Sequence, residues 1–454
     1  MADLVWLGSL LIFALVGAPV LTQARFRGLG VPARAVLSGA AGAATVSFAM
    51  TLFTLGRQPW SLLPITALAL ALAAGLGTLA RRSSNAPPAR EDAPGERRSP
   101  AEILGTAVAV LGVVAALAAT LAAAATSPDL FFFWGAKAQQ FAAARGVDAA
   151  YLAEPAHAYM HAYYPPLVGN LGGLVSIAAG RFSWTSATLT FPILLAALAA
   201  ALPGLLRGAT GRRRASAVAA VVVTALAVVG IGASVAGNGD MPLVFFETLA
   251  VALLLRRDAG DPAVQLLAGI LFAGAAATKV EGLVVAVAAP ILFLALRPAK
   301  SRSPAAAAAR LLGPTAVTLG AWFAVGAATG LFREYSEYGS FFALHPENWR
   351  AVVASLPMAL GSVGFGLPGL VPIAALVLAG RPQRGEWMPL GSSACLIVFL
   401  VFAYLHHVRD PSQWIVWSAA RVLMPVPVLL ALALAGGGPE PGRATPQSAA
   451  SSPR

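Results

Sequence analysis

Long apolar runs recur along the entire chain, and they constrain its fold more than any other feature of the sequence. Most runs reach about 18 residues, the length at which an α-helix crosses the hydrocarbon core of a bilayer. No alternation of apolar and polar residues indicates a membrane β-barrel instead. The sequence therefore predicts an all-α fold, a polytopic bundle of about 13 transmembrane helices. The runs lie near residues 4–22, 35–55, 60–80, 103–126, 184–206, 216–236, 241–256, 262–278, 281–297, 311–331, 351–379, 389–405 and 417–436.

The composition excludes a soluble globular protein. Hydrophobic residues make up 58% of the chain and charged residues only 11%, with a mean hydropathy of +0.75, whereas soluble domains carry about 25% charged residues. The single cysteine, Cys395, lies inside an apolar run and has no partner for an internal disulfide or a metal site. No Lys or Arg precedes the first apolar run, which favours an uncleaved first helix over a secretory signal.

The net charge of +12 is explained by membrane topology rather than by nucleic acid. If residues 23–34 face the cytoplasm, alternation of the helices places more than two thirds of the 31 Lys and Arg residues on that side. Cytoplasmic loops of membrane proteins carry this excess of basic residues. We therefore expect no nucleic-acid partner. The Ala- and Gly-rich composition, with Arg preferred over Lys, is typical of a high-GC bacterium and predicts the bacterial cytoplasmic (inner) membrane.

The chain divides into four segments. Residues 1–80 form a three-helix transmembrane segment, 81–102 a basic, Pro-rich cytoplasmic linker, 103–436 a transmembrane core, and 437–454 a disordered cytoplasmic tail. Within the core, residues 166–180 are short and contain four glycines, so we interpret them as an interfacial or re-entrant piece at the outer surface.

Chemistry-bearing residues gather in the predicted outer loops. All five histidines fall there, in loops covering 127–183, 332–350 and 406–416. Long loops of this kind tend to be functional. Together they could cover a cavity that opens to the membrane from the outer leaflet.

The stretch "SPDLFFFWGAKAQQF", residues 127–141, combines an aromatic cluster containing Trp134 with Asp129 and Lys137. If the preceding helix continues, Asp129 and Lys137 share a face about 12 Å apart along the axis. They would then be an acid at a reacting centre and a cation near a phosphate. The alternative is a helix end held at the membrane surface by aromatic side chains and a snorkelling lysine.

A second stretch, "HAYMHAYYPPLVGN", follows at residues 157–170. His157 and His161 are four residues apart, a spacing that suits a metal on a helix, but two histidines alone are a weak signal. Tyr163 and Tyr164 precede two prolines and supply flat surfaces that can stack on a sugar ring. The alternative is a rigid turn at the level of the lipid head groups.

Charged residues near the predicted outer helix ends complete the set of candidates. Asp240 precedes a helix, where ordinary N-capping also explains it. Glu247 lies two turns further along the same face inside the apolar region, where acids are costly and usually functional. Lys279 and Glu281 lie in a turn between two helices, where snorkelling is the alternative. Arg421 lies above Pro425 and Pro427 and could bind a phosphate.

In their order along the chain, these motifs resemble the GT-C superfamily of integral-membrane glycosyltransferases. The order is "PDLFFFWGAKA", "HAYYPPLVGNLGGL", "GRFSW", "GNGDMPLVFF", "TKVEG" and "SAARVLMPVP". The chain is most similar to bacterial members grouped with the protein O-mannosyltransferases and the aminoarabinose transferases. The resemblance covers roughly residues 103–436. It implies that outer loops and short interfacial helices form an active-site cavity.

The resemblance also implies a mechanism. The donor is a sugar on a polyprenyl phosphate in the bilayer, and the acceptor is a glycan, a lipid or a protein. Asp129 matches the essential acid and would act as general base in an inverting displacement. Cations would bind the donor phosphate, and our candidates are Lys137, Lys279 and Arg421. Substrate-binding candidates are Trp134, His157, His161, Tyr163, Tyr164, Asp240, Glu247 and Glu281.

The chain departs from the family pattern at two places. Tyr163 stands where relatives often carry an acid, and Asp129 lacks the second acid that is common beside it. This argues against a metal site built from paired carboxylates, so we expect no cofactor.

Two other functions compete with the transferase. A transporter or flippase for a lipid-linked or anionic substrate would use Glu247, Asp240 and Arg421 as a midplane site. A non-catalytic scaffold would tolerate replacement of Asp129 and Lys137. The transferase hypothesis requires Asp129, Asp240, Lys279 and Arg421 to converge, and it fails if Lys279 and Arg421 point into lipid on opposite sides.

Overall fold

A computed structural model describes most of the chain, namely residues 2–22, 26, 28–82, 99–296, 303–331, 344–380, 384–407 and 410–436. The described residues are α-helical and contain no strand, only one isolated parallel bridge between Thr126 and Ala236. The prediction of an all-α fold is confirmed. Most of the predicted linker and the whole predicted tail lie outside the described residues, as do residues 332–343 of the second loop.

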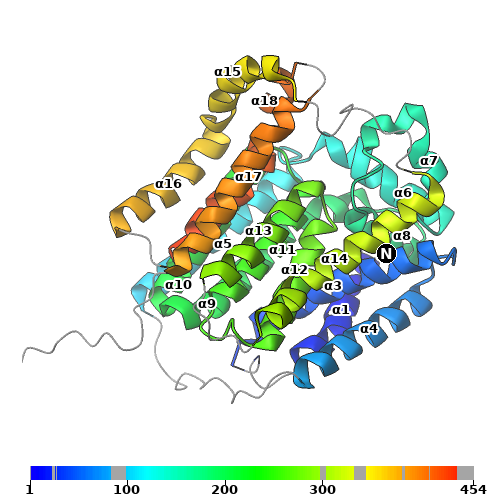
Figure 1. The fold of residues 1–454 in the computed structure, drawn as a ribbon, viewed down its shortest axis with the longest axis horizontal. Coiled ribbons are helices and arrows are strands. Elements are labelled where there is room, and N and C mark those ends of the chain that lie inside the picture. Colours follow the sequence, from blue (N-terminus) through cyan, green and yellow to red (C-terminus); the bar gives the residue numbers. More distant parts are fainter. Residues whose placement is uncertain are drawn as a thin grey trace, which may run out of the picture.

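Most of the helices run side by side in one bundle (Figure 1). They are α1 (Ala2–Leu21), α3 (Val31–Leu55), α4 (Leu62–Arg82), α5 (Pro100–Leu121), α9 (Trp184–Thr210), α10 (Arg212–Gly232), α11 (Asp240–Leu255), α12 (Pro262–Ala276), α13 (Val280–Leu296), α14 (Pro304–Thr329), α16 (Val363–Ala379), α17 (Trp387–Leu405), α18 (Ser412–Val422) and α19 (Pro425–Ala433). The remaining helices are α6 (Gly135–Ala144), α7 (Ala149–Ala153), α8 (Leu167–Ala179) and α15 (Trp349–Leu360), with the short π- or 3₁₀-helical segments η1 (Leu130–Trp134), η2 (Pro155–Met160), η3 (Pro346–Asn348) and η4 (Arg384–Glu386).

Nine helices of the described residues are long and apolar enough to cross a membrane. They give the chain the architecture of a multi-pass membrane protein, as the apolar runs predict. These candidate spans are Leu4–Leu21, Val31–Leu55, Leu62–Arg82, Pro100–Leu121, Trp184–Thr210, Arg212–Gly232, Pro304–Thr329, Trp387–Leu405 and Ser412–Ala433. The predicted number of about 13 spans is not confirmed.

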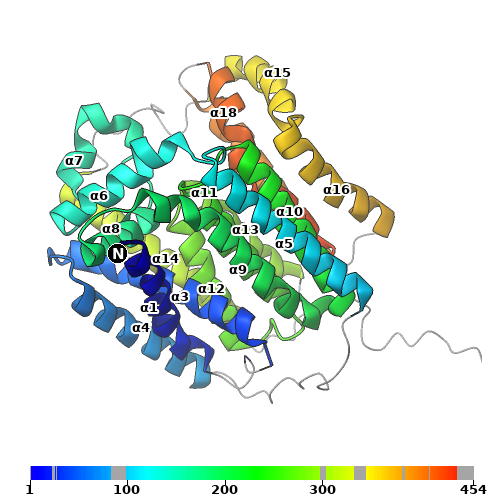
Figure 2. The same cartoon turned by 180° about the vertical axis from the view of Figure 1, so that it is seen from behind.

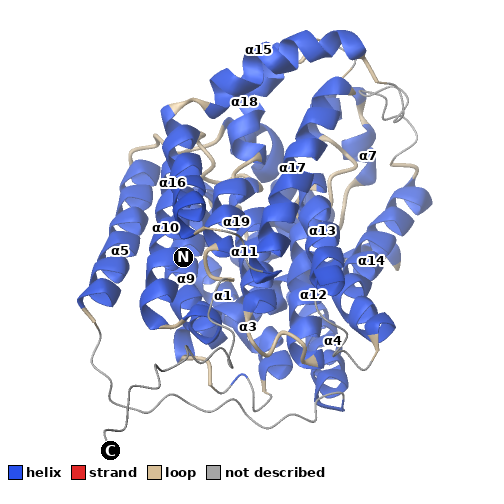
Figure 3. Cartoon of the chain, turned by 60° about the vertical axis from the view of Figure 1, so that its left-hand side comes forward, coloured by secondary structure: helices blue, strands red, loops and turns tan. Residues whose placement is uncertain are grey.

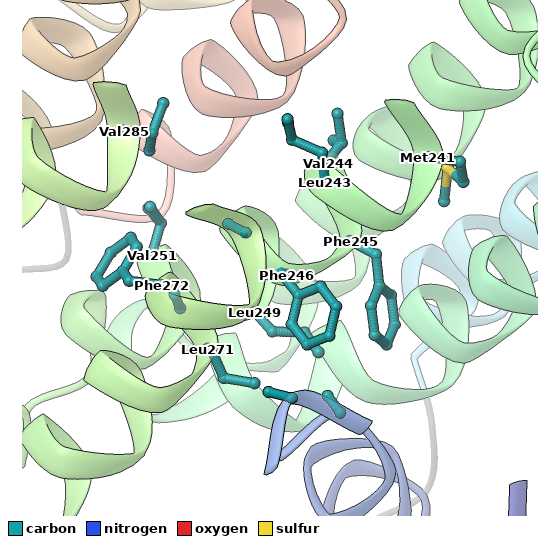
Figure 4. Packing of buried hydrophobic residues seen from close by; sticks show 14 of the residues in the cluster. Met241, Leu243, Val244, Phe245, Phe246, Leu249, Val251, Leu271, Phe272 and Val285 are labelled. Carbon is teal, nitrogen blue, oxygen red and sulfur yellow. The ribbon is translucent and has the colours of Figure 1, made fainter. Parts of the chain in front are cut away.

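Three of the expected spans form helices too short to count as membrane crossings. Helices α11, α12 and α13 contain 16, 15 and 17 residues, less than the roughly 20 that a lipid-facing span requires. Nearly every residue of α11 and α12 is buried by neighbouring helices. Figure 4 shows Phe246 of α11 and Phe272 of α12 within this packing. A helix that is apolar on all sides is a core helix, and one enclosed by other helices need not match the lipid thickness.

The run at 351–379 does not form one straight helix. It divides into α15 and α16, with an 82° bend between Pro346–Leu360 and Phe365–Ala379. The chain turns at Gly361 and Ser362, where Ser362 has an extended backbone (φ −60°, ψ 148°). As a result, α15 lies across one end of the bundle while α16 runs along its side (Figure 3).

The three N-terminal helices pack onto the core rather than standing apart from it. Helix α3 contacts α8, α9, α12 and α14 as well as α1 (Figure 2). Glycines allow the closest approach: a Cβ added at Gly17 of α1 would lie 1.9 Å from the Ser38 carbonyl oxygen, and one at Gly42 of α3 would lie 1.8 Å from that of Phe13. Backbone contact of this kind is typical of membrane helix pairs.

Helix α8 occupies the Gly-rich stretch at 166–180. It contains 13 residues, too few to cross a bilayer. It packs between α6 on one side and α1 and α3 on the other.

Candidate functional site

The segment that carries Asp129 is fixed to the segment that carries Asp240. Helix α5 ends at Leu121, and Ala123 adopts a left-handed backbone with φ 62°. The chain then pairs with residues 235–236: the Ser127 N–H donates to the Ala236 carbonyl at 3.0 Å, and the Ala236 N–H donates to that of Ala125 at 2.8 Å. The two acids, more than 100 residues apart, are therefore brought to the same end of the bundle.

The continuous helix on which a shared face of Asp129 and Lys137 depends does not form. The break at Ala123 ends the helix, and residues 130–134 then form a π-helical turn before α6 begins. A π-turn contains more residues than an α-turn, so α-helical spacing does not relate Asp129 to Lys137. The two side chains bind different partners.

Two glycines let the loop before Asp240 lie against the π-turn. A Cβ at Gly237, where φ is 87°, would lie 2.6 Å from the Leu130 side chain, and one at Gly239 would lie 2.7 Å from the Trp134 ring. Between them, the Asn238 Oδ1 accepts a hydrogen bond from the Asp240 N–H at 2.9 Å. These contacts fix the direction of the Asp240 side chain.

An ion-pair chain of Asp129, Arg421, Asp240, Lys279 and Glu281 crosses this end of the bundle. The Arg421 Nη1 lies 2.5 Å from the Asp129 Oδ2 and 4.0 Å from the Asp240 Oδ2. The Lys279 Nζ lies 2.6 Å from the Asp240 Oδ1 and 3.5 Å from the Glu281 Oε1. Asp129, Asp240, Lys279 and Arg421 thus converge, and Lys279 and Arg421 do not point into lipid on opposite sides.

Exposure is highest at the Asp129 end of the ion-pair chain and lowest at Asp240 in its middle. The Asp129 side chain is 41% exposed and that of Arg421 18%, whereas those of Asp240 and Lys279 are 4% and 10% exposed. The accessible end therefore carries the acid Asp129, and the Asp240–Lys279 pair is largely buried. Such a site can exchange an anion at Arg421 and accept a proton at Asp129.

The tyrosine loop before α8 borders the same cluster. The Trp322 Nε1 of α14 donates to the Tyr163 carbonyl at 3.1 Å, and the Leu167 N–H donates to the carbonyl of Ala277, two residues before Lys279, at 2.9 Å. Tyr164 stacks on His161 with ring centroids 4.9 Å apart and interacts electrostatically with Arg421. Burial, with the charges of Lys137 and Lys279, lowers the pKa of His161 to about 3, so its ring is neutral at physiological pH.

Lys137 does not join the ion-pair chain. It is 4% exposed, and its Nζ donates to the His161 carbonyl at 3.2 Å and lies 4.1 Å from the centroid of the Phe133 ring. Burial lowers its pKa from 10.5 to about 7. The structure thus assigns Lys137 a position beneath the tyrosine loop, in contrast to the phosphate contact expected from the sequence.

The buried Lys137 gives a testable pH dependence. Between pH 7 and 10.5 the unfolded chain holds a proton on Lys137 that the folded chain does not. The free energy of unfolding therefore rises with pH in this window, by at most about 1.4 kcal/mol per pH unit. We expect Lys137→Met to lack this rise and to exceed the wild type in stability below pH 7. Thermal unfolding in detergent as a function of pH measures both, and parallel curves would contradict the prediction.

His157 and His161 do not form a pair. His157 lies in the 3₁₀ turn η2, where its Nδ1 is 2.8 Å from the Tyr151 carbonyl and 3.4 Å from the Glu154 carboxylate. His161 follows with a left-handed backbone, φ 48°. The spacing of four residues therefore falls on no regular α-helix. Throughout the described part of the chain, no three His, Cys, Asp or Glu residues are grouped to hold a metal ion.

Glu247 lies apart from the ion-pair chain, seven residues after Asp240 on α11. It is 1% exposed, and neither carboxylate oxygen has a hydrogen-bond partner among the described residues. Glu281 is near enough to interact with it electrostatically. Burial of an unpaired carboxylate at this depth is costly, which keeps Glu247 a candidate for function.

Sequence reasoning did not single out two residues that shape the site. Asn238 orients Asp240, and an Asn two residues before an Asp at a helix start is a signal for such a turn. Trp322 lies within an apolar run, and nothing local distinguishes it from a lipid-facing tryptophan. Comparison of the chain with protein-family models, with curated proteins and with solved structures finds no match to any of them.

Proposed function

We propose that this protein is an inverting membrane glycosyltransferase that moves a sugar from a polyprenyl-phosphate donor to an acceptor. The observation that carries the proposal is the ion-pair chain, which joins Asp129 to Arg421, Asp240 and Lys279 at one end of the bundle. These residues come from four of the motifs that resemble the GT-C superfamily.

Arg421 and Lys279 bind the donor phosphate in this proposal. The Arg421 guanidinium bridges two carboxylates, so a donor phosphate that reaches it takes the place of one of these anions. Guanidinium groups bind phosphate oxygens through two parallel hydrogen bonds. The same cation stabilises the negative charge that grows on the phosphate as the sugar leaves.

Asp129 is the general base, because it is the most exposed acid of the ion-pair chain. The acceptor hydroxyl oxygen attacks the anomeric carbon while the bond from that carbon to the phosphate oxygen breaks. The hydroxyl proton passes to the Asp129 carboxylate, and the polyprenyl phosphate leaves with the bonding electron pair. Attack from the face opposite the leaving group inverts the anomeric configuration. Tyr164 supports the proposal as a flat surface for the sugar ring, since its ring stacks on that of His161 in the loop that borders the ion-pair chain.

The distribution of charge supports a site on the outer face of the bacterial cytoplasmic membrane. The ion-pair chain lies at one end of the bundle, where α5 ends and α11 begins. Basic clusters lie at the other ends of the same helices or their neighbours, at Arg81–Arg82, Arg212–Arg214 and Arg256–Arg257. Basic clusters face the cytoplasm, so the opposite end faces the periplasm or cell exterior.

The direct test is donor turnover. The full chain in lipid nanodiscs is given a panel of labelled polyprenyl-phosphate sugars together with lipid, glycan and protein acceptors. We expect one donor to lose its sugar to one acceptor class with inverted anomeric configuration. If no donor is consumed with any acceptor, the proposal fails.

A transporter or flippase is the second candidate, and Glu247 is the observation that favours it. An unpaired acid buried in a membrane bundle often marks a substrate or proton path. The two candidates differ in one readout. A flippase moves a lipid-linked sugar between the leaflets of a proteoliposome with the sugar–phosphate bond intact, whereas the transferase breaks that bond.

A further inference from the structure

The N-terminal helices α1, α3 and α4 lie outside the part of the chain that resembles the GT-C superfamily, yet they hold the elements on both sides of the tyrosine loop. This loop, residues 161–166, leads directly into α8. Helices α6 and α8 pack on each other, and α8 also packs on α3 (Figure 2). Two contacts with the N-terminal helices fix this arrangement.

The first contact joins Asn170 of α8 to α3. Asn170 is fully buried, and its Nδ2 donates to the Ser47 carbonyl at 3.1 Å. The same Nδ2 lies 3.3 Å from the hydroxyl oxygens of Ser47 and Thr51. The Asn170 backbone N–H donates to the Pro166 carbonyl at 2.7 Å. A single residue thus connects the end of the tyrosine loop to a membrane helix of the N-terminal segment.

The second contact is made by Trp60, which lies fully buried in the turn between α3 and α4. Its N–H donates to the Arg145 carbonyl at the end of α6 at 2.8 Å, and its ring meets that of Phe141 edge-on, with centroids 6.0 Å apart. Helix α6 also carries Lys137, whose Nζ donates to the His161 carbonyl at the start of the tyrosine loop. Both ends of the loop are therefore tied to elements that rest on the N-terminal helices.

Glycines allow α8 to lie this close to its neighbours. A Cβ added at Gly172 would lie 2.8 Å from the Ala138 Cβ of α6, and one at Gly173 would lie 3.2 Å from the Trp60 ring. These glycines and Asn170 follow the tyrosines within one motif, "HAYYPPLVGNLGGL". The second half of the motif thus anchors the first half.

The Asn170 amide contributes orientation more than stability. Its Oδ1 is buried without a hydrogen-bond partner among the described residues, and burial of an unpaired acceptor is costly. An apolar side chain would fill the same place without this cost. The contacts of Nδ2, in contrast, select one position of α8 along α3, as buried polar groups do when they fix the register of packed helices.

We propose that Asn170 is a positioning residue that holds the tyrosine loop at the border of the ion-pair chain, and that α3 is therefore part of the functional site. Asn170 acts through Pro166 on Tyr164, two residues earlier in the loop. The consequence for donor binding rests on the proposed function, in which Tyr164 is the flat surface for the sugar. The anchor itself does not depend on sugar transfer.

Asn170→Ala removes the anchor with little risk to folding. The Ser47 carbonyl keeps its hydrogen bond from the Thr51 hydroxyl at 3.1 Å, and the unpartnered Oδ1 disappears. Alanine is also the better helix former, so a looser tyrosine loop could not arise from a weaker α8. Ser176→Ala is the matched control on the same helix, because the buried Ser176 hydroxyl donates only within α8, to the Gly172 carbonyl at 2.7 Å.

The test is amide hydrogen exchange, measured by mass spectrometry on the full chain in nanodiscs. We expect peptides that cover residues 161–169 to exchange about tenfold faster in Asn170→Ala, with α9 to α13 unchanged. Ser176→Ala should match the wild type throughout. Unchanged exchange of residues 161–169 overturns the proposal, and so does equal acceleration along the whole chain, which would show a general stabilising role.

A second variant tests the anchor from the side of α3. Thr51→Val removes one acceptor of the Asn170 amide and leaves α8 unaltered, so we expect the same peptides to exchange about threefold faster. Wild-type exchange in Thr51→Val together with faster exchange in Asn170→Ala would place the effect within α8 and overturn the role of α3.

The exchange measurement stands or falls separately from the proposed function. Once a donor is known, Asn170→Ala is expected to raise the donor KM by about three- to tenfold and to leave kcat nearly unchanged, because Asp129 and Arg421 keep their contacts. A lower kcat at an unchanged donor KM would overturn the role of Asn170 in donor binding. If no donor is consumed while exchange responds as expected, the proposed function fails and the anchor remains.

Discussion

Asp129→Asn is expected to lower sugar transfer by about 10²–10⁴-fold. The amide keeps the shape of the carboxyl group but cannot take the acceptor proton. The loss should appear in kcat rather than in the donor KM, because the substitution releases Arg421 from its 2.5 Å ion pair and leaves that cation for the phosphate. Single-turnover transfer reports the loss in the chemical step, and donor binding, measured on the same nanodisc preparation, reports any change in affinity for the donor.

Asp148→Asn is the matched control for this experiment. Asp148 belongs to the same loop region, where it caps α7 by accepting from the Tyr151 N–H and binds the Gln140 amide. It takes no part in the ion-pair chain, and we expect its replacement to leave turnover nearly unchanged. Asp129 is partly exposed, so loss of its ion pair should cost little stability, about 0–1 kcal/mol. Equal turnover by wild type and Asp129→Asn would remove Asp129 as the base.

Hydropathy predicts which segments of the sequence form helices. An apolar segment in a membrane must satisfy its own backbone hydrogen bonds, and this requirement depends on that segment alone. Hydropathy does not predict which helices face lipid. The run at 241–256 reads as a span, yet α11 is a buried core helix of 16 residues. The run at 351–379 is long enough for one span, but the extended backbone at Ser362 bends it.

The partners of the charged residues depend on long-range packing, which the sequence does not display. Asp129 and Arg421 are 292 residues apart, and only the fold brings them into contact. The order of the motifs indicated that both belong to one site, but not that they pair with each other. The shared face of Asp129 and Lys137 is absent for a local reason: the left-handed Ala123 and the π-turn at 130–134 break the α-helical spacing that it requires.

Lys279→Met is expected to destabilise the fold by about 3–5 kcal/mol. The Lys279 Nζ is the nearest cation to the buried Asp240 carboxylate, at 2.6 Å, and it also pairs with Glu281. Its removal leaves two acids in a low-dielectric environment with only Arg421, at 4.0 Å from Asp240, to compensate. Unfolding by denaturant in detergent measures the loss, and a stability equal to that of the wild type would contradict the burial of this pair.

The double variant Asp240→Asn, Lys279→Met separates the structural role of the pair from its role in transfer. Removing both charges eliminates the Asp240–Lys279 pair as a unit, and replacement of a whole buried pair is often neutral; Glu281 alone loses its cation, which lies 3.5 Å away in the wild type. We therefore expect the double variant to recover the part of the stability that the unpaired Asp240 costs in Lys279→Met. A double-mutant cycle should then give a coupling free energy of at least about 0.5 kcal/mol. Transfer should stay impaired, since the donor phosphate has lost one of its two cations. Recovery of both stability and turnover would mean that Lys279 serves only to neutralise Asp240, and phosphate binding would then rest on Arg421 alone.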